Sequence, residues 1–258
     1  SSRFFIQKDV PIYHKVLLES FKVNKIAKQE RNIQSIQWEK NLSSKYLSKI
    51  KVTQSFQYSN EERESNKLNS VIYKYEIDQV NSNGTSVDLY SNPTKNWQIN
   101  SGIDYNADKI KSALIDKNLT TGVSVNKRGL YPNNSSYKSF SVFNLHKIDL
   151  KKWHIEAGLR YNRFGIQLTD TSIGEVNIHP SALVGNAGIS YKLNRSNLVY
   201  ASLSSGYRAP NIDDMGTLGI VDFRYELPSN NLAPEKSLHY ELGYKLNIKI
   251  YLLFCSRT

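Results

Sequence analysis

Few residues in this chain have the types and spacing that catalysis requires. The 258 residues include five histidines and one cysteine. A single cysteine forms neither an internal disulfide nor a cysteine-based zinc cluster. The sequence also lacks the short motifs of serine hydrolases, P-loop nucleotide binders, zinc proteases and dithiol oxidoreductases. We therefore expect no catalytic residues, no metal site and no resident cofactor.

The remaining acidic and histidine side chains are scattered. Four of them lie at polar positions of alternating segments: His154, Glu156, His239 and Glu241. A water-facing surface explains these four without catalysis. Asp213, Asp214 and Asp222 invite a calcium interpretation, but their spacing fits no fixed calcium loop. A solvated loop is the preferred interpretation of the three aspartates.

The strongest structural signal is a strict alternation of apolar and polar residues. One face of residues 153–163 carries Trp153, Ile155, Ala157, Leu159 and Tyr161. A period of two over this length predicts a β-strand, and eight steps of ~3.3 Å give roughly 26 Å. Tilt shortens this to roughly 20 Å along a membrane normal, near the ~25 Å apolar band of an outer-membrane barrel. Residues 238–246 repeat the pattern.

The connections between these segments alternate in length. Short ones are predicted near Pro93, at residues 147–152 and at 194–196, and long ones at 108–136, 164–181 and 211–233. Outer-membrane barrels have this arrangement, whereas a β-sandwich has no reason to place every long loop at one end. The sequence thus predicts an all-β fold, an antiparallel transmembrane β-barrel present in part. About nine or ten strands are expected, with short periplasmic turns and long extracellular loops.

The first part of the chain is less regular. Residues 16–28 suit a helix or a loop equally, and residues 61–64 are expected to be a solvated charged loop. Residues 71–92 predict one long strand with a bulge at Asn83-Gly84, in preference to a hairpin turn there. Asn92-Pro93 predicts the next turn.

The charge and the apolar runs of the chain limit which partners and which membrane segments are expected. The net charge of +11 would suit nucleic acid, but lysine and arginine are spread along the chain, so no nucleic-acid partner is expected. The longest apolar run, residues 250–255, is far shorter than the ~20 residues of a membrane-spanning helix. Residues 1–5 lead into a charged stretch rather than the apolar core of a signal peptide.

Two short motifs flank the polar segment 211–228. Residues 207–210 read Tyr-Arg-Ala-Pro and residues 229–232 read Ser-Asn-Asn-Leu. With the flanking strands, they resemble the strand–loop–strand in the C-terminal part of TonB-dependent outer-membrane receptors. Heme and hemoglobin receptors of that family have Phe-Arg-Ala-Pro and Asn-Pro-Asn-Leu there. The residues that carry the motif are Tyr207, Arg208, Ala209, Pro210, Asn231, Leu232, Pro234, Glu235 and Ser237.

The resemblance spans most of residues 10–246, and it implies a location and partners. Such receptors reside in the bacterial outer membrane, contact its lipid and take up an iron complex, heme or another scarce nutrient. A TonB-type protein supplies energy through a plug region that is not visible here. In the heme receptors, a histidine between the motifs binds heme. This chain has no histidine there, and Met215 or Tyr225 would be the substitute ligands, with plain contact surface as the alternative.

Three further expectations concern organisation. Arg208 and Glu235 lie at the two ends of the long loop, which we call its feet. They should hold these ends in register, either by a charge pair or by separate contacts to the backbone. Residues 1–246 are expected to be a partial receptor barrel, and residues 247–258 a non-native tail after truncation or frameshift. Such a fragment should be inactive alone. The alternatives are a passive porin-like barrel, and a soluble β-sandwich adhesin or carbohydrate-binding module.

Overall fold

The structure is a computed structural model that describes residues 1–12, 20–171, 173–221, 224–230 and 232–247. Its main strands are β1 (Ser2–Pro11), β2 (Phe21–Asn41), β3 (Lys49–Lys67), β4 (Ile72–Thr94), β5 (Trp97–Asn118), β7 (Ser135–Leu150), β8 (Trp153–Asp170), β10 (Ser181–Lys192), β11 (Asn197–Arg208) and β14 (Glu235–Leu246). The smaller elements are β6 (Ser124–Lys127), β9 (Gly174–Ile178), α1 (Ile212–Gly216), β12 (Gly219–Val221) and β13 (Arg224–Glu226).

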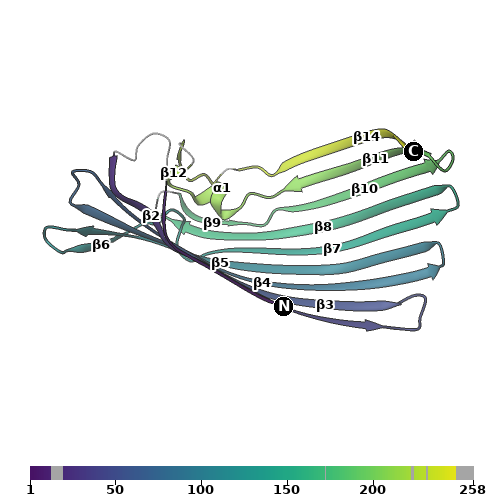
Figure 1. Ribbon diagram of the computed structural model, residues 1–258, viewed down its shortest axis with the longest axis horizontal. Coiled ribbons are helices and arrows are strands. Elements are labelled where there is room, and N and C mark those ends of the chain that lie inside the picture. The colour runs from purple at the N-terminus through teal and green to yellow at the C-terminus, as the bar shows by residue number, and fades with distance from the viewer. Residues whose placement is uncertain (13–19, 172, 222–223, 231, 248–258) are drawn as a thin grey trace, which may run out of the picture.

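The main strands form one antiparallel sheet in chain order. Its order is β1-β2-β3-β4-β5-β7-β8-β10-β11-β14, with β6 added to β5 and β9 added to β8, which makes 12 strands. The strands β12 and β13 pair separately. Figure 1 shows the main strands side by side along the long axis of the molecule. The described strands thus form one meander, not two face-to-face sheets, and the β-sandwich alternative finds no support.

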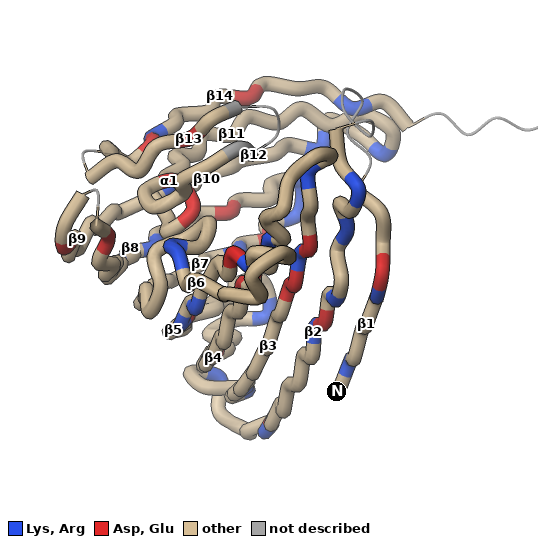
Figure 2. The backbone as a smooth tube through the Cα atoms, turned by 90° about the vertical axis from the view of Figure 1, so that its left-hand side faces the viewer, with Lys and Arg blue, Asp and Glu red and all other residues tan. Residues whose placement is uncertain are grey.

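The two ends of the sheet differ. At the right-hand end of Figure 1, short connections join the strands, at residues 42–48, 95–96, 151–152 and 193–196. At the left-hand end lie β6, β9, α1 and β12. Figure 2 looks at that end and shows the strands curving around α1 and the loop before β7. We call the face of the sheet that carries α1 concave and the opposite face convex.

Alternation along each strand makes the convex face apolar. Leu159 and Leu183 are 62% and 67% exposed on this face, and Leu242 is 85% exposed. The concave face is polar, and there Arg160 Nη2 lies 2.8 Å from Asp104 Oδ2. Large apolar side chains exposed along one whole face of a soluble protein would be costly, whereas lipid accommodates them. The alternation predicted for residues 153–163 is confirmed, and the strand continues to Asp170.

The strands extend further than the sequence predicted. Residues 61–64, expected to be a solvated loop, lie inside β3, so that expectation is wrong. Their charges are paired across strands: Arg63 Nη2 is 2.5 Å from Asp78 Oδ2, and Glu64 contacts Lys25 at 3.3 Å. Cross-strand pairing lets a charged sequence stay in a ladder because opposite charges face each other. For residues 16–28 the sequence does not decide between helix and loop. Of these, 21–28 belong to β2, and 16–19 lie outside the described residues.

The predicted bulge at Asn83-Gly84 is also wrong, although residues 72–94 do form one strand. Asn83 and Gly84 pair in register with Phe56 and Ser55. Glycine at position 84 leaves room for the neighbouring strand, because a Cβ there would lie 2.6 Å from Ser55 Oγ. The turn expected at Asn92-Pro93 falls at residues 95–96, after a register shift between Ser91 and Thr94.

Two of the predicted long loops are mostly strand. β5 continues to Asn118 and folds back through β6, and β8 continues to Asp170 and folds back through β9. Only the segment 211–233 remains a connection of the expected kind, with α1, β12 and β13 inside it. The long connections therefore do lie at one end of the sheet. Two of them are extended hairpins, in which β6 pairs with β5 and β9 pairs with β8.

The sheet does not close within the described residues. β1 pairs only with β2, and β14 pairs only with β11, so each presents one free edge. The ten strands of the main path agree with the nine or ten expected. The division at residue 246 remains a prediction, because residues 248–258 lie outside the described part of the chain.

Candidate functional site

The candidate site lies at the end of the sheet that carries α1. This helix begins after Asn211, whose side-chain Oδ1 accepts a hydrogen bond from the Asp214 backbone N–H at 2.8 Å. Asp214 Oδ2 in turn accepts from the Asn211 N–H at 3.0 Å. This reciprocal capping satisfies two backbone donors that a helix start leaves open. A five-residue helix therefore forms because its first turn is capped and its apolar side is buried.

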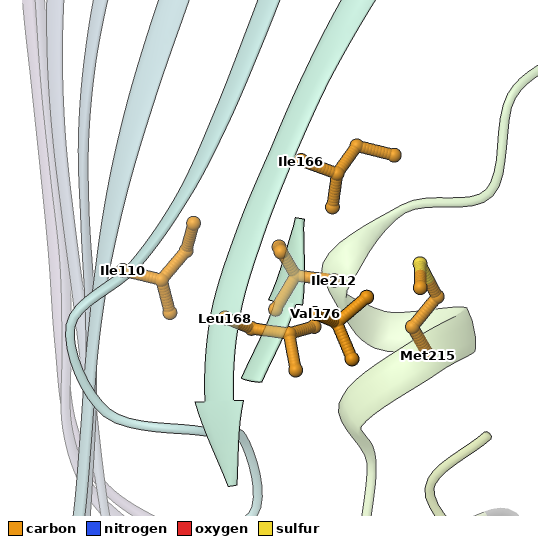
Figure 3. Packing of buried hydrophobic residues seen from close by; sticks show 6 residues of the cluster. All are labelled: Ile110, Ile166, Leu168, Val176, Ile212 and Met215. Atoms are coloured by element: carbon orange, nitrogen blue, oxygen red, sulfur yellow. The ribbon is translucent and has the colours of Figure 1, made fainter. Parts of the chain in front are cut away.

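The apolar side of α1 docks on the concave face of the sheet. Figure 3 shows the cluster of Ile110, Ile166, Leu168, Val176, Ile212 and Met215. Met215 and Ile166 are both 0% exposed. Full burial of one such side chain stabilises by about 1.5–3 kcal/mol. These contacts hold the long connection between β11 and β14 against the sheet wall.

A second loop, residues 128–134, joins the same cluster through Arg128. Its Nε donates to Asp170 Oδ2 at 2.7 Å, and the Asp170 side chain is only 1% exposed. Its Nη1 donates to the carbonyls of Gly129 and Leu130, and its Nη2 donates to the carbonyl of Gly216. One guanidinium thus links β8, the 128–134 loop and the end of α1.

The 128–134 loop also contacts the wall at β5. The Tyr131 N–H donates to Ser112 Oγ at 3.1 Å, and the Ser112 N–H donates to Asn133 Oδ1 at 3.2 Å. A Cβ at Gly129 would lie 2.2 Å from Ser112 Oγ, so only glycine fits this approach. Burial and the charge of Asp213 raise the pKa of the Tyr131 phenol, which keeps it neutral between the loops.

The feet of the long connection are fastened by Arg208. Its Nη1 lies 2.8 Å from Glu235 Oε1, and its Nη2 lies 2.7 Å from Asp214 Oδ1. Of the two expected arrangements, a charge pair or separate contacts to backbone, the structure has the charge pair between Arg208 and Glu235. The hydrogen bond to Asp214 and the two carboxylate charges raise the pKa of Arg208. The structure adds the third member, Asp214, which ties the foot to α1.

The other motif residues surround this foot. The Tyr207 ring stacks on Phe164 with centroids 6.0 Å apart. Ala209 and Pro210 are buried beside α1, and Ser237 lies opposite Gly206. Leu232 is exposed, Pro234 is partly buried and Asn231 lies outside the described residues. The first motif therefore builds the base of the loop, and the second brings the chain back to it.

An open pocket of about 370 Å³ lies between the two feet. Its lining includes Arg208, Asp214, Thr217, Glu226, Leu232 and Glu235. The carboxylates outnumber the guanidinium, and two of them already accept from Arg208. Apolar Leu227 and Leu232 supply the remaining contact surface. The lining thus combines charged, polar and apolar side chains.

The structure separates the two proposed substitute ligands. Met215 is buried in the apolar cluster and does not line the pocket. Tyr225 on β13 is 66% exposed. Of the three aspartates, Asp214 pairs with Arg208, and Asp213 Oδ1 accepts from Thr217 Oγ1 at 2.9 Å. Asp222 lies outside the described residues.

Among the described residues, no three His, Cys, Asp or Glu side chains gather closely enough to hold a metal ion. Within the same residues, no helix has the length and apolar character needed to cross a membrane.

Sequence reasoning missed Arg128, Asp170 and the 128–134 loop. Both charged residues fell inside stretches expected to be long polar loops, where an isolated charge carries no signal. The only local hint is Gly129, since a glycine beside an arginine can mark a close backbone approach. The partnership itself joins residues 42 positions apart in the chain.

Comparison with known proteins matches this geometry. A family model described as TonB dependent receptor-like, beta-barrel, matches residues 19–253. No curated protein sequence matches the chain significantly.

Solved structures share the fold at low sequence identity. The chain is similar to the copper transporter OprC, with a TM-score of 0.72, 12% identity and 87% of this chain covered. It is similar to the ferric citrate transporter FecA, with a TM-score of 0.63, 14% identity and 88% covered. It is also similar to the Serratia marcescens hemophore receptor HasR, with a TM-score of 0.62, 14% identity and 88% covered. The chain spans 37%, 33% and 37% of those three chains.

Proposed function

We propose, from the premise that this chain belongs to the TonB-dependent receptor β-barrel family, that it forms one section of an outer-membrane importer. The cargo is an iron complex, heme or a similar metal-containing nutrient. The receptor takes its energy from a TonB-type inner-membrane protein through a plug region. The chain has no catalytic role.

One observation carries this proposal. The family match over residues 19–253 coincides with a single antiparallel meander whose convex face is apolar and whose projections lie at one end. That combination suits a wall between lipid and a wet interior. The solved neighbours with this fold are named as transporters of copper and ferric citrate and as a hemophore receptor.

The free edges favour a larger barrel. In lipid, an unpaired row of N–H and C=O groups is expensive, so membrane sheets close on themselves. The ten main strands of the described residues have free edges at β1 and β14, and they need further strands to close. Plugged transporters of this kind have about 22 strands. We infer that this chain supplies a little under half of such a wall.

Ligand contact is assigned to the loop layer, a name we give to the 128–134 loop and the connection 211–233 that contains α1. The pocket between the feet, together with exposed Tyr225 and Leu232, offers polar and aromatic surface at the end that should face the medium. The motif residues Arg208 and Glu235 support this surface by fixing its base. Met215 supports it from beneath, through the apolar cluster.

Deletion of the gene in its native host tests the proposal. Growth is measured with ferric citrate, hemin or a copper salt as the limiting metal source, and uptake is followed with isotopically labelled metal. We expect deletion of the gene to abolish the uptake of one cargo, and complementation to restore it. A protonophore should abolish that uptake, because energy coupling requires the proton gradient.

Two results would contradict the proposal. Uptake that persists with the protonophore would identify a passive porin-like barrel. Equal growth and uptake of every tested metal source with and without the gene would remove the transport assignment.

A further inference from the structure

A basic patch lies on the convex face where the apolar band ends. It consists of Lys109 and Lys111 on β5, Lys138 on β7 and Arg163 on β8, all exposed. These strands are neighbours in the sheet, as Figure 1 shows. The sequence spreads its basic residues evenly, so only the strand register gathers these four.

The register places the four side chains on the lipid-facing surface. Lys109 and Lys111 alternate with Ile110 and Ser112, which are buried toward the concave face at 8% and 3% exposure. Arg163 follows Leu159 and Tyr161 at intervals of two along β8. Successive side chains of a strand point to opposite faces, so the basic residues share the face of the apolar band.

The patch begins at an aromatic row. Tyr105 pairs with Phe140, and Phe140 pairs with Arg163, so these three lie in one row across the sheet. Lys138 lies one row further out and Lys109 two rows out, at roughly 7 and 13 Å along the strands. Aromatic girdles mark the border between hydrocarbon and headgroups. The basic side chains therefore stand at the depth of the headgroups, on the side of the projecting hairpins.

The patch has no carboxylate partner within the described residues. The ion pairs of this region use other cations: Arg63 with Asp78, Lys127 with Asp116 and Arg128 with Asp170. Convex positions of β5, β7 and β8 beyond the aromatic row carry no acidic residue. On the neighbouring strands, Glu175 of β9 pairs with Thr169, three rows beyond Arg163. Glu62 of β3 lies two strands from Lys111, and its carboxylate accepts from Tyr75 Oη and Asn60 Nδ2.

We propose that Lys109, Lys111, Lys138 and Arg163 bind the phosphate groups of anionic lipid headgroups in the leaflet that surrounds the projecting hairpins. The proposal rests on the membrane placement in the proposed function and is independent of the cargo.

The spacing suits phosphate. Lys138 is diagonal to Arg163 and to Lys109 across neighbouring strands, and diagonal neighbours lie about 7–8 Å apart. An ammonium group on a flexible stem reaches over this distance to share an anion. The guanidinium of Arg163 donates two parallel hydrogen bonds to phosphate oxygens. Unpaired cations at this depth would repel each other, and anionic headgroups relieve that repulsion.

Lipid titration of the complete receptor in neutral detergent tests the patch. Short-chain phosphatidic acid, short-chain phosphatidylcholine and inorganic phosphate are the probes, and bound lipid is counted by native mass spectrometry. The patch variant replaces all four residues with Gln. A matched variant removes three lysines and one arginine at the short turns, Lys95, Lys151, Lys152 and Arg195, which are also exposed. Heat-modifiable migration checks the folding of each receptor.

We expect phosphatidic acid to bind the wild type and the turn variant alike, and the patch variant about tenfold or more weaker. If the fourfold variant does not fold, the pair Lys138→Gln and Arg163→Gln should show at least half of that loss on a logarithmic scale. Equal binding by the patch and turn variants would overturn the proposal. Competition by inorganic phosphate at the same concentration would overturn it too, because the site would then be a simple anion site. Failure of the receptor to enter the outer membrane would instead count against the proposed function.

Discussion

Arg128 and Asp170 form a buried ion pair that fastens two loops to the wall of the sheet. The guanidinium Nε lies 2.7 Å from Asp170 Oδ2, and the same guanidinium donates to the carbonyl of Gly216 at the end of α1. Neither loop has a large core of its own. The pair therefore joins the 128–134 loop, the end of α1 and β8.

Arg128→Met should loosen the loop layer while the sheet persists. Removing one partner of a buried pair leaves the other charge in a poor environment, at a cost of about 3–5 kcal/mol. Hydrogen exchange of residues 212–217 in the complete receptor should accelerate, whereas β8 amides paired with β10 should be unchanged. Lys127→Gln is the control, since Lys127 pairs with Asp116 but its side chain is 55% exposed. Unchanged exchange in Arg128→Met would show that the apolar cluster alone holds α1.

The convex face should reject charge. Leu159 is 62% exposed in the middle of β8, and Leu159→Arg should destabilise a complete barrel by roughly 2–4 kcal/mol near the membrane midplane. Asn186→Arg introduces the same side chain on the concave face of neighbouring β10 and should cost much less. Urea titration of refolded receptor in lipid vesicles measures both. Equal costs would contradict the assignment of the two faces.

The α1 end of the sheet should face the medium. Thr217 is 2% exposed and would resist labelling reagents on either side of the membrane. Leu227 is 69% exposed and is the better position. In a Cys255→Ser background of the complete receptor, Leu227→Cys should react with an impermeant maleimide in whole cells. Lys151→Cys at a short turn should react only after the outer membrane is disrupted, and the reverse pattern would invert the topology.

Arg208 should matter for ligand binding more than for stability. Its side chain is half-exposed, and exposed ion pairs add little to folding. Arg208→Gln removes the link between Asp214 and Glu235, so the pocket between the feet loses its fixed shape. We expect weaker binding of the cargo identified by growth, with an unchanged unfolding midpoint. Arg195→Gln at a short turn is the matched control, and equal affinity in both variants would argue against a pocket role.

The 258-residue chain expressed alone with an export signal should not transport. Among the described strands, β1 and β14 each have a free edge, and the convex face is broadly apolar. Exposed edges and apolar patches promote aggregation. We expect degradation or aggregates in cell fractionation. A heat-modifiable, protease-resistant barrel that supports nutrient uptake would contradict both the strand count and the proposal of a larger wall.

The sequence by itself determined the clearly alternating strands and their faces. Side-chain direction in a strand repeats every two residues, so the order of residues in β8 predicts which of them form its apolar face. A charge pair between Arg208 and Glu235 was one of two arrangements expected from the sequence, because their motifs flank one connection between strands. Where the alternation fades, as at residues 61–64 and 108–118, sequence reasoning placed loops instead of strands. At residues 61–64 the ladder continues because charged partners on neighbouring strands stabilise it, and no local signal reports a partner on another strand.

Only the tertiary structure decided how the loop layer is built and where charges gather. Met215 is a residue type that can bind a metal, and it lies in a loop connection. It is nevertheless buried, because it packs in one apolar cluster with Ile166 and Leu168. Arg128 and Asp170 meet because two hairpins fold toward the same concave face. Lys109, Lys138 and Arg163 become neighbours through the register of β5, β7 and β8. Each of these contacts depends on the alignment of separate strands, which a period-two pattern specifies only within its own strand.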